Sequence, residues 1–308
     1  MKVPLRIVQA RRERLATLVA QHGFLPVGEL CRQLGVSEAT ARRDLSALEE
    51  AKKIKRTYGG AISEFDSRFP SFTERRDQSR SAKEKIAVTA HSFIVPGSTL
   101  FLDAGTTVYA IAEALCTRPV VPLTVVTPSI PVAEILAGIA GIEVFLVAGQ
   151  LLPRQSVLLG VMAIKSLDFW HFDQAFLSGE GMNEEGLWNS QITIVAQQKA
   201  VLRRSHRALF CLDDSKLKRT ALSFLMPWRD VDLLLTNVPL RTLEKAGIAI
   251  RPTQYCQATG QRHRPEMLEI PDRTTNAGEL PVHMLWNQTD DPQIQPAMDL
   301  RKKNIFYD

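Results

Sequence analysis

The 308-residue sequence lacks the features of a membrane or secreted protein. It contains no run of about 18 apolar residues, which is the length that a transmembrane helix needs. Residues 1–15 carry scattered charges and no apolar segment of the kind found in a signal peptide. The sequence therefore predicts a cytoplasmic protein with no membrane partner.

Cysteine is scarce and widely spaced. The four cysteines form no CxxC pair, and no Cys/His pattern has the spacing of a zinc site. We expect reduced thiols, no metal site and no cofactor. The four residues are Cys31, Cys116, Cys211 and Cys256.

Positive charge is unevenly distributed along the chain. Residues 1–60 contain 12 Lys and Arg against 6 Asp and Glu, whereas the remaining residues contain 26 against 27. The basic excess therefore lies in the first sixty residues. This asymmetry predicts a nucleic-acid-binding head on a nearly neutral body.

Residues 37–48 have the pattern of a helix that reads DNA. Ser37 is a good N-cap, and Ala41, Leu45 and Leu48 recur at i, i+4 and i+7 to form one buried face. The opposite side carries short hydroxyls and two arginines, which can bind phosphates or guanine edges in a major groove. These candidate DNA-binding residues are Ser37, Thr40, Arg42, Arg43 and Ser46.

The surrounding residues predict a winged helix-turn-helix. Apolar periodicity predicts a first helix over residues 6–21 and a short second helix over residues 26–34, which Gly35 ends. Two β-prone pieces around Gly59 and Gly60 predict a wing hairpin. Lys55 and Arg56 on that hairpin are further candidates for phosphate contacts.

The head resembles the winged helix-turn-helix of DeoR-family transcription regulators. The resemblance rests on a signature in two parts. The first part is an Arg followed by two apolar residues at helical spacing. The second part is, in order, a small residue, a Thr, an apolar residue, an Arg, a basic residue, an Asp and an apolar residue. In this sequence the positions are filled by Arg11, Leu15, Val19, Ser37, Thr40, Ala41, Arg42, Arg43, Asp44 and Leu45. The resemblance implies binding to double-stranded operator DNA.

The rest of the chain predicts a linker, a body and a tail. Residues 1–62 form the expected DNA-binding domain, and the polar residues 63–81 the expected linker. Either Phe72 and Arg75 pin this linker onto the body, or the linker is unpinned and disordered. Residues 82–251 alternate apolar strands with helices, which predicts an α/β body with a mostly parallel sheet covered on both faces. Residues 252–308 have no clear periodicity, and we expect a disordered tail.

Small, hydroxyl-bearing and charged residues gather where the predicted strands end. Ligands of open α/β sheets bind at the carboxyl ends of the strands, and a glycine turn that opens a helix directs N–H groups toward an anion. These turns therefore predict a pocket for a small anionic ligand. The candidate effector-binding residues are Asp103, Gly105, Thr106, Thr107, Thr127, Ser129, Ser178, Gly181, Ser215 and Lys216.

The body also resembles the DeoR-type sensor domain, which is similar to ribose-5-phosphate isomerase and the CoA transferases. The family pattern LDAGTT stands at residues 102–107, and the Asp-Ser-Lys motif at residues 214–216. The family's Thr-Asn-Ser, Gly-Gly and Thr-Asp are Thr127-Pro128-Ser129, Ala148-Gly149 and Thr236-Asn237 here. The resemblance implies a phosphorylated sugar or related metabolite as effector.

The sequence predicts a regulator, most simply a repressor of a sugar or related carbon catabolism operon that works as a homo-oligomer on repeated half-sites. One alternative is an isomerase-like enzyme with an accessory head, for which Glu180 and the Asp213/Asp214 pair are possible acid and base groups. We expect no catalysis, because the lysine and acidic loop of such isomerases are replaced. A second alternative is a constitutive DNA-binding protein with a vestigial pocket.

Overall fold

A computed structural model describes residues 5–22, 24–51, 53–57, 60–63 and 70–261. The head begins with three helices, in agreement with the helix-turn-helix prediction. Gly35, with φ at +63°, makes the turn before the third helix, a conformation that favours glycine. The helices are α1 (Leu5–His22), α2 (Val27–Leu34) and α3 (Glu38–Glu50).

The head has a small core and a three-stranded antiparallel sheet. Leu15 and Val19 of α1, Leu30 of α2, and Leu45 and Leu48 of α3 are buried together. The wing hairpin is confirmed, and a further strand that the sequence did not predict pairs with it in the order β1-β3-β2. The strands are β1 (Phe24–Pro26), β2 (Ile54–Thr57) and β3 (Gly60–Ser63).

The body is built on a seven-stranded sheet in which every neighbouring pair is parallel. The strand order β15-β14-β12-β9-β4-β5-β6 confirms the predicted fold class of an α/β mostly parallel sheet. The strands are β4 (Thr99–Leu102), β5 (Leu123–Thr127), β6 (Ile142–Leu146), β9 (Phe172–Leu177), β12 (Ser205–Cys211), β14 (Leu233–Thr236) and β15 (Tyr255–Gln257).

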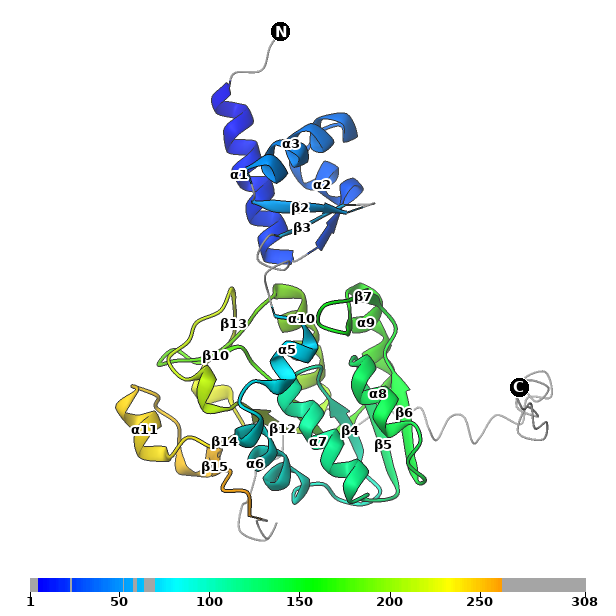
Figure 1. Cartoon of the computed structure of the whole chain (residues 1–308), viewed down its shortest axis with the longest axis vertical. Coiled ribbons are helices and arrows are strands. Elements are labelled where there is room, and N and C mark those ends of the chain that lie inside the picture. The colour runs from blue at the N-terminus through cyan, green and yellow to red at the C-terminus, as the bar shows by residue number, and fades with distance from the viewer. Residues whose placement is uncertain (1–4, 23, 52, 58–59, 64–69, 262–308) are drawn as a thin grey trace, which may run out of the picture.

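Helices cover both faces of this sheet (Figure 1). Successive side chains of a strand point to opposite faces, so Leu100 and Leu102 pack on one side while Phe101 packs on the other. The first core includes residues of α6, α7 and α8, and the second includes residues of α9, α10 and α11. The helices are α6 (Arg80–His91), α7 (Thr106–Thr117), α8 (Ile130–Leu136), α9 (Val161–Ser166), α10 (Ile192–Leu202) and α11 (Leu240–Lys245).

Short elements that the sequence did not predict complete the body. The hairpin β7 (Gln150–Leu152) and β8 (Val157–Leu159) follows β6. A small antiparallel sheet joins β10 (Gly181–Met182), β11 (Leu187–Asn189) and β13 (Ser223–Met226). The 3₁₀ turns are η1 (Leu167–Phe169), η2 (Asp214–Lys216), η3 (Trp228–Asp230) and η4 (Pro252–Gln254).

The bounds of the expected linker were wrong over its second half, where Phe72 and Arg75 pin the segment to the body as one of the two alternatives predicted. Helix α5 (Phe72–Asp77) begins within it, and α6 begins at Arg80. Ser71 and Glu74 form a capping box, and Phe72 packs edge-on against Tyr109 of α7, with ring centroids 5.2 Å apart. The segment therefore belongs to the packed body from residue 70 onward.

The expectation for the tail was wrong at its beginning. Strand β15 pairs in parallel with β14 and forms one edge of the large sheet, and Cys256 is buried. Residues 262–308, which we also expected to be disordered, lie outside the described residues.

The head and the body meet through two helices. Helix α1 of the head lies against α10 of the body (Figure 1). Within the described residues, no helix is long and apolar enough to cross a bilayer.

Candidate functional site

Some of the predicted DNA-binding residues at α3 are already bonded to other described residues of the head, whereas Arg43 is not. The Ser37 hydroxyl caps the helix by accepting from the Thr40 N–H at 3.4 Å. Arg42 is paired with Glu38 one turn earlier, with Nε 2.9 Å from Oε1. Arg43 is exposed, and within the described part of the head it makes no hydrogen bond or ion pair. Arg43 is therefore the arginine of α3 that is available to a partner.

The remaining candidates of the head are less exposed to a partner or not described. The Ser46 hydroxyl donates to the Arg42 carbonyl at 3.0 Å, so it faces its own helix. Lys55 and Arg56 lie in β2, which packs next to α3, but their side chains lie outside the described part of the structure.

The signature residues Arg11 and Asp44 support the fold. Asp44 is 2% exposed, and its two oxygens accept from Arg11 Nε at 2.6 Å and from Arg12 Nε at 3.0 Å. Burial acts to raise the pKa of Asp44, but the hydrogen bonds and positive charges of the two arginines outweigh it and lower the pKa. These contacts fix α3 against α1, which sets how α3 is presented.

In the body, Asp103 joins the carboxyl ends of two neighbouring strands. It follows β4 and is 4% exposed. Its Oδ1 accepts from the Ala104 N–H at 2.8 Å, and its Oδ2 accepts from the N–H and hydroxyl of Ser178, which follows β9, at 3.0 and 2.9 Å. Gln198 of α10 also donates to Oδ2, at 2.8 Å. Asp103 thus organises the site through protein donors.

The glycine turn after Asp103 is closely packed. A Cβ at Gly105 would lie 2.1 Å from the Ser178 hydroxyl, so only glycine fits there. Gly105 is the N-cap of α7 and provides no side-chain cap, while Thr106 and Thr107 lie buried in the first turn. The first turn of α7 therefore presents its positive end beside Ser178.

Three basic side chains gather around the turn that follows β9. The Lys216 ammonium lies 2.7 Å from Oε2 of Glu180, and Nη1 of Arg75 lies 3.6 Å from Oε1 of the same carboxylate. The Lys83 ammonium donates to the backbone carbonyls of Arg75 and Gln78, which ties α5 to α6. We call Arg75, Lys83, Glu180, Asp213 and Lys216 the charged cluster.

Burial changes the electrostatics of this charged cluster. Burial lowers the pKa of Arg75, while the charges of Glu180 and Asp103 oppose that change. Burial also lowers the pKa of Lys83; the Asp213 charge opposes this, and the charges of Lys216 and Arg75 add to it. The cluster therefore holds three cations and two carboxylates close together where β9 and β12 end.

Asp213 carries an unpaired oxygen inside the charged cluster. The residue is 1% exposed, and its Oδ1 accepts from the Ser215 N–H at 2.9 Å. Its Oδ2 is buried with no hydrogen-bond partner among the described residues. A buried acceptor left in this way is costly unless a donor reaches it, so Oδ2 is suited to a ligand hydroxyl.

Four of the predicted effector residues have structural roles or lie at the margin. The Thr127 hydroxyl donates to the Leu102 carbonyl at 2.6 Å, and the Ser129 hydroxyl caps α8; both residues are 0% exposed. A Cβ at Gly181 would lie 2.3 Å from the Arg219 carbonyl, so backbone covers this glycine. Ser215 is exposed in η2.

The sequence did not point to Arg75 or Lys83 as site residues. Both lie on helices that precede the first strand of the body, and not in the turns after its strands where ligands of α/β sheets are expected. The Ser71 and Glu74 spacing of a capping box was the signal that α5 is a helix and that Arg75 has a fixed place.

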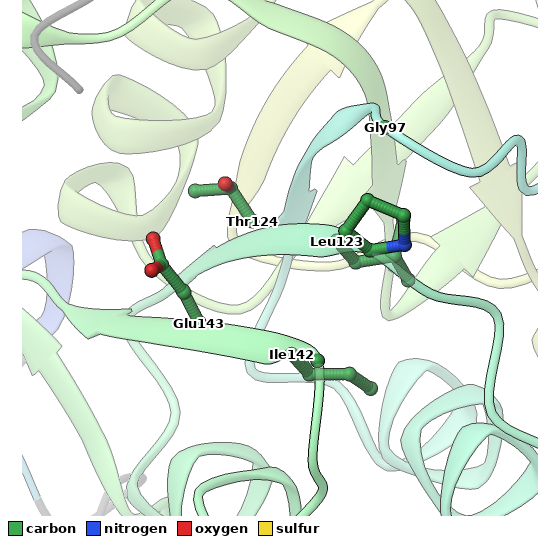
Figure 2. A pocket seen from close by; sticks show the side chains of 7 residues that line it. Gly97, Leu123, Thr124, Ile142 and Glu143 are labelled. Atoms are coloured by element: carbon green, nitrogen blue, oxygen red, sulfur yellow. The ribbon is translucent and has the colours of Figure 1, made fainter. Parts of the chain in front are cut away.

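Two cavities lie at opposite ends of the strands of the body. The first, of about 170 Å³, is lined by residues of α5, α6 and α7 that include Lys83 and Thr106, so it adjoins the charged cluster. The second, of about 350 Å³, lies at the opposite, amino-terminal ends of β4, β5 and β6. Figure 2 shows Thr124 and Glu143 side by side on neighbouring strands there. Among the described residues that line it, Glu143 is the one that carries a charge, so the second cavity does not suit an anion.

The described residues contain no group of three or more His, Cys, Asp and Glu side chains arranged to hold a metal ion. The chemistry at the strand ends is that of buried cations, helix N–H groups and one unpaired carboxylate oxygen. Such an arrangement can hold a small molecule that carries an anionic group and a hydroxyl.

Comparison with known families covers both parts of the chain. Residues 11–65 match the model of the DeoR-like helix-turn-helix domain, and residues 78–238 match the model of the DeoR C-terminal sensor domain. The second match alone spans more than half of the chain.

Characterised relatives align over most of their length. The HTH-type transcriptional repressor GlcR of Bacillus subtilis is 33% identical over 231 residues, which cover 74% of this chain and 88% of that protein. The HTH-type transcriptional regulator UlaR of Escherichia coli K12 is 29% identical over 249 residues, which cover 78% of this chain and 97% of that protein.

Solved structures are more distant. Ribose 5-phosphate isomerase A from Methanocaldococcus jannaschii is 18% identical, with a TM-score of 0.34, over 46% of this chain and 55% of that chain. The tetrameric eIF2B-β2-δ2 complex from C. thermophilum is 17% identical, with a TM-score of 0.40, over 79% of this chain and 78% of that chain. These scores are too low to bear on function.

Proposed function

The chain belongs to the DeoR family of DNA-binding transcriptional regulators, and we propose that it is a repressor whose body binds a phosphorylated sugar or related metabolite. On this proposal α3 reads the operator, and the charged cluster receives the effector. Effector binding then changes the affinity of the head for DNA, with a coupling of about 1–3 kcal/mol.

The observation that carries the effector proposal is the gathering of Arg75, Lys83 and Lys216 around the carboxyl end of β9. Guanidinium and ammonium groups bind phosphate through charge-assisted hydrogen bonds, and burial strengthens them. The first turn of α7 adds N–H groups on the Asp103 side. The unpaired Oδ2 of Asp213 is suited to a sugar hydroxyl. On one ligand, a phosphate would match the cations and the N–H groups of α7, and a hydroxyl would match Oδ2 of Asp213.

The isomerase-like alternative is not favoured. The relatives are named as transcriptional regulators and not as enzymes. Glu180, a candidate acid or base, is paired with Lys216 and Arg75, and Asp214 is exposed and bonded to Asn237. The third candidate, Asp213, is buried, and its Oδ1 accepts from the Ser215 N–H.

Two measurements test the proposal. Calorimetry should show that sugar phosphates bind and that their unphosphorylated parent sugars do not. A Lys216→Gln variant should weaken sugar-phosphate binding at least ten-fold, while Lys218→Gln, an exposed lysine two residues away, serves as the control. Parents that bind as well as phosphates would contradict the assignment of the effector.

Titration of the protein onto the promoter region beside its own gene tests the regulator role. Specific binding at fixed salt that the bound phosphate weakens would support a repressor. Operator binding that no phosphate changes would favour a constitutive DNA-binding protein with a vestigial pocket.

A further inference from the structure

Glu180 pairs with two of the three cations of the charged cluster through one carboxylate. Its Oε2 lies 2.7 Å from the Lys216 ammonium, and its Oε1 lies 3.6 Å from Nη1 of Arg75. The three side chains are only 11–17% exposed, so water screens this contact little. Each oxygen of the carboxylate is thus directed at a different cation, as two oxygens of a phosphate would be.

We propose that the Glu180 carboxylate is a built-in competitor for the anionic group of the effector. This inference rests on the proposed function of the charged cluster as an effector site. A phosphate and the Glu180 carboxylate cannot both contact Arg75 and Lys216. Two negative groups that contact the same two cations lie close together and repel each other strongly. An incoming phosphate must therefore displace the side chain of Glu180.

The structure allows the side chain of Glu180 to leave while its backbone stays. The Glu180 N–H donates to the Trp188 carbonyl at 2.9 Å, which anchors the turn to β11. The side chain is 16% exposed, so it has a route toward solvent. Asp213 differs, because it is 1% exposed and its Oδ1 is held by the Ser215 N–H.

The consequence is selectivity against free phosphate. Any anion that enters has to replace the contacts that Glu180 makes with Arg75 and Lys216. A ligand that also brings a hydroxyl gains a hydrogen bond at Oδ2 of Asp213, which offsets that cost. Inorganic phosphate carries only the hydroxyls on its own phosphorus, whereas a sugar phosphate brings further hydroxyls that can extend to Oδ2 while the phosphate stays on the two cations. Glu180 thus lets the pocket distinguish a sugar phosphate from the phosphate ion.

Glu180→Gln tests this competition, with inorganic phosphate as the probe. The substitution keeps the size of the side chain and removes its charge. Calorimetry should show inorganic phosphate binding at least ten-fold more tightly to Glu180→Gln than to the wild type. The preference for a sugar phosphate over inorganic phosphate should fall by a similar factor.

Glu185→Gln is the matched control. It removes the same charge five residues away, on the exposed turn between β10 and β11, and it should bind inorganic phosphate as the wild type does. An equal gain in both variants would mean that net charge alone is responsible, and would overturn the proposal.

Glu180→Asp covers the case in which Glu180→Gln does not fold. Its shorter side chain keeps the charge but cannot reach Lys216 and Arg75 together, so phosphate affinity should again exceed that of the wild type. If phosphates bind the wild type and neither Glu180 variant binds inorganic phosphate more tightly, this inference fails and the proposed function stands. If no phosphate compound binds any of these proteins, the pocket is not an anion site and both fail.

Discussion

At the scale of single residues, Asp44 shows that some charged residues of the DNA-binding signature stabilise the head and do not face a partner. The sequence places it between Arg43 and Leu45 on the helix that we expect to read DNA, yet its carboxylate is buried against Arg11 and Arg12. The negative charge of the motif therefore holds α3 in place, whereas Arg43 beside it stays exposed, and we expect Arg43 to contact DNA.

Replacing Asp44 by Asn should destabilise the head. Breaking a fully buried ion pair costs about 3–5 kcal/mol, and because Arg11 and Arg12 are partly exposed we expect about 1–3 kcal/mol here. Urea unfolding of the isolated variant chain, followed by circular dichroism, measures the loss. Unchanged stability at pH 7 would contradict this role.

The same pair predicts a pH dependence with a definite sign. The pKa of Asp44 in the folded head lies below its ordinary value of 3.8. Its stabilisation is therefore fully present above that value and is lost as the pH falls through it toward the folded pKa. The difference in unfolding free energy between the wild type and Asp44→Asn should shrink as the pH is lowered from 6 to 3. A difference that stays constant over this range would contradict the prediction.

Arg43→Ala should abolish specific operator binding and leave the fold intact. Arg43 is exposed and makes no contact among the described residues, so its loss costs the folded head little. Each lost base or phosphate contact should cost about 1–3 kcal/mol per head. Gel-shift titration at fixed salt measures this, with Arg14→Ala on the exposed side of α1 as the charge-matched control. Equal affinity of the two variants would rule out Arg43 as a DNA contact.

At the scale of elements, the glycine turn between β4 and α7 fixes how two strand ends meet. A Cβ at Gly105 would lie 2.1 Å from the Ser178 hydroxyl, so Gly105→Ala has to push Ser178 away from Asp103. We expect a loss of about 1–3 kcal/mol of unfolding free energy. Gly138→Ala, where nothing lies within 4 Å, is the control and should be nearly neutral in the same urea titration. A Gly105→Ala protein as stable as the control would show that the turn can relax.

Strong periodicity let the sequence predict most of the elements. The sequence predicts strands over residues 123–127 and 233–236 and a helix over residues 192–202, and β5, β14 and α10 span those residues. Apolar runs specify these elements locally. Strand β15 and the hairpin β7–β8 are three residues per strand and depend on partners far along the chain. Local patterns do not contain that information.

The candidate site was predictable in part for the same reason. Strand ends pointed to Asp103, Ser178 and Lys216, which the structure brings to one edge of the sheet. Thr127 and Ser129 also end a strand, but they satisfy neighbouring backbone groups instead. Arg75 enters the site from a helix, and only the packing of α5 on the body places it there.

At the scale of the whole molecule, we expect more than one copy of the chain to act together. One α3 contacts too few base pairs for tight specificity, and helix-turn-helix proteins gain it by pairing heads on repeated half-sites. Sedimentation equilibrium should therefore give a mass that is a multiple of 34.4 kDa. A monomer at the concentration that saturates the operator would contradict this expectation.

Gln198 has a mechanical consequence for how the two ends of the molecule communicate. One amide group donates to the Asp103 carboxylate and to the Ser178 carbonyl, both at 2.8 Å, and accepts from Asn189. The same helix, α10, lies against α1 of the head. Eleven helical residues form a rod about 16 Å long, and a close-packed core does not absorb a displacement by compressing. We therefore expect α10 to move as a rigid body when the Ser178 turn shifts. Its contact with α1 would then displace the helix-turn-helix head without a flexible hinge between the two domains.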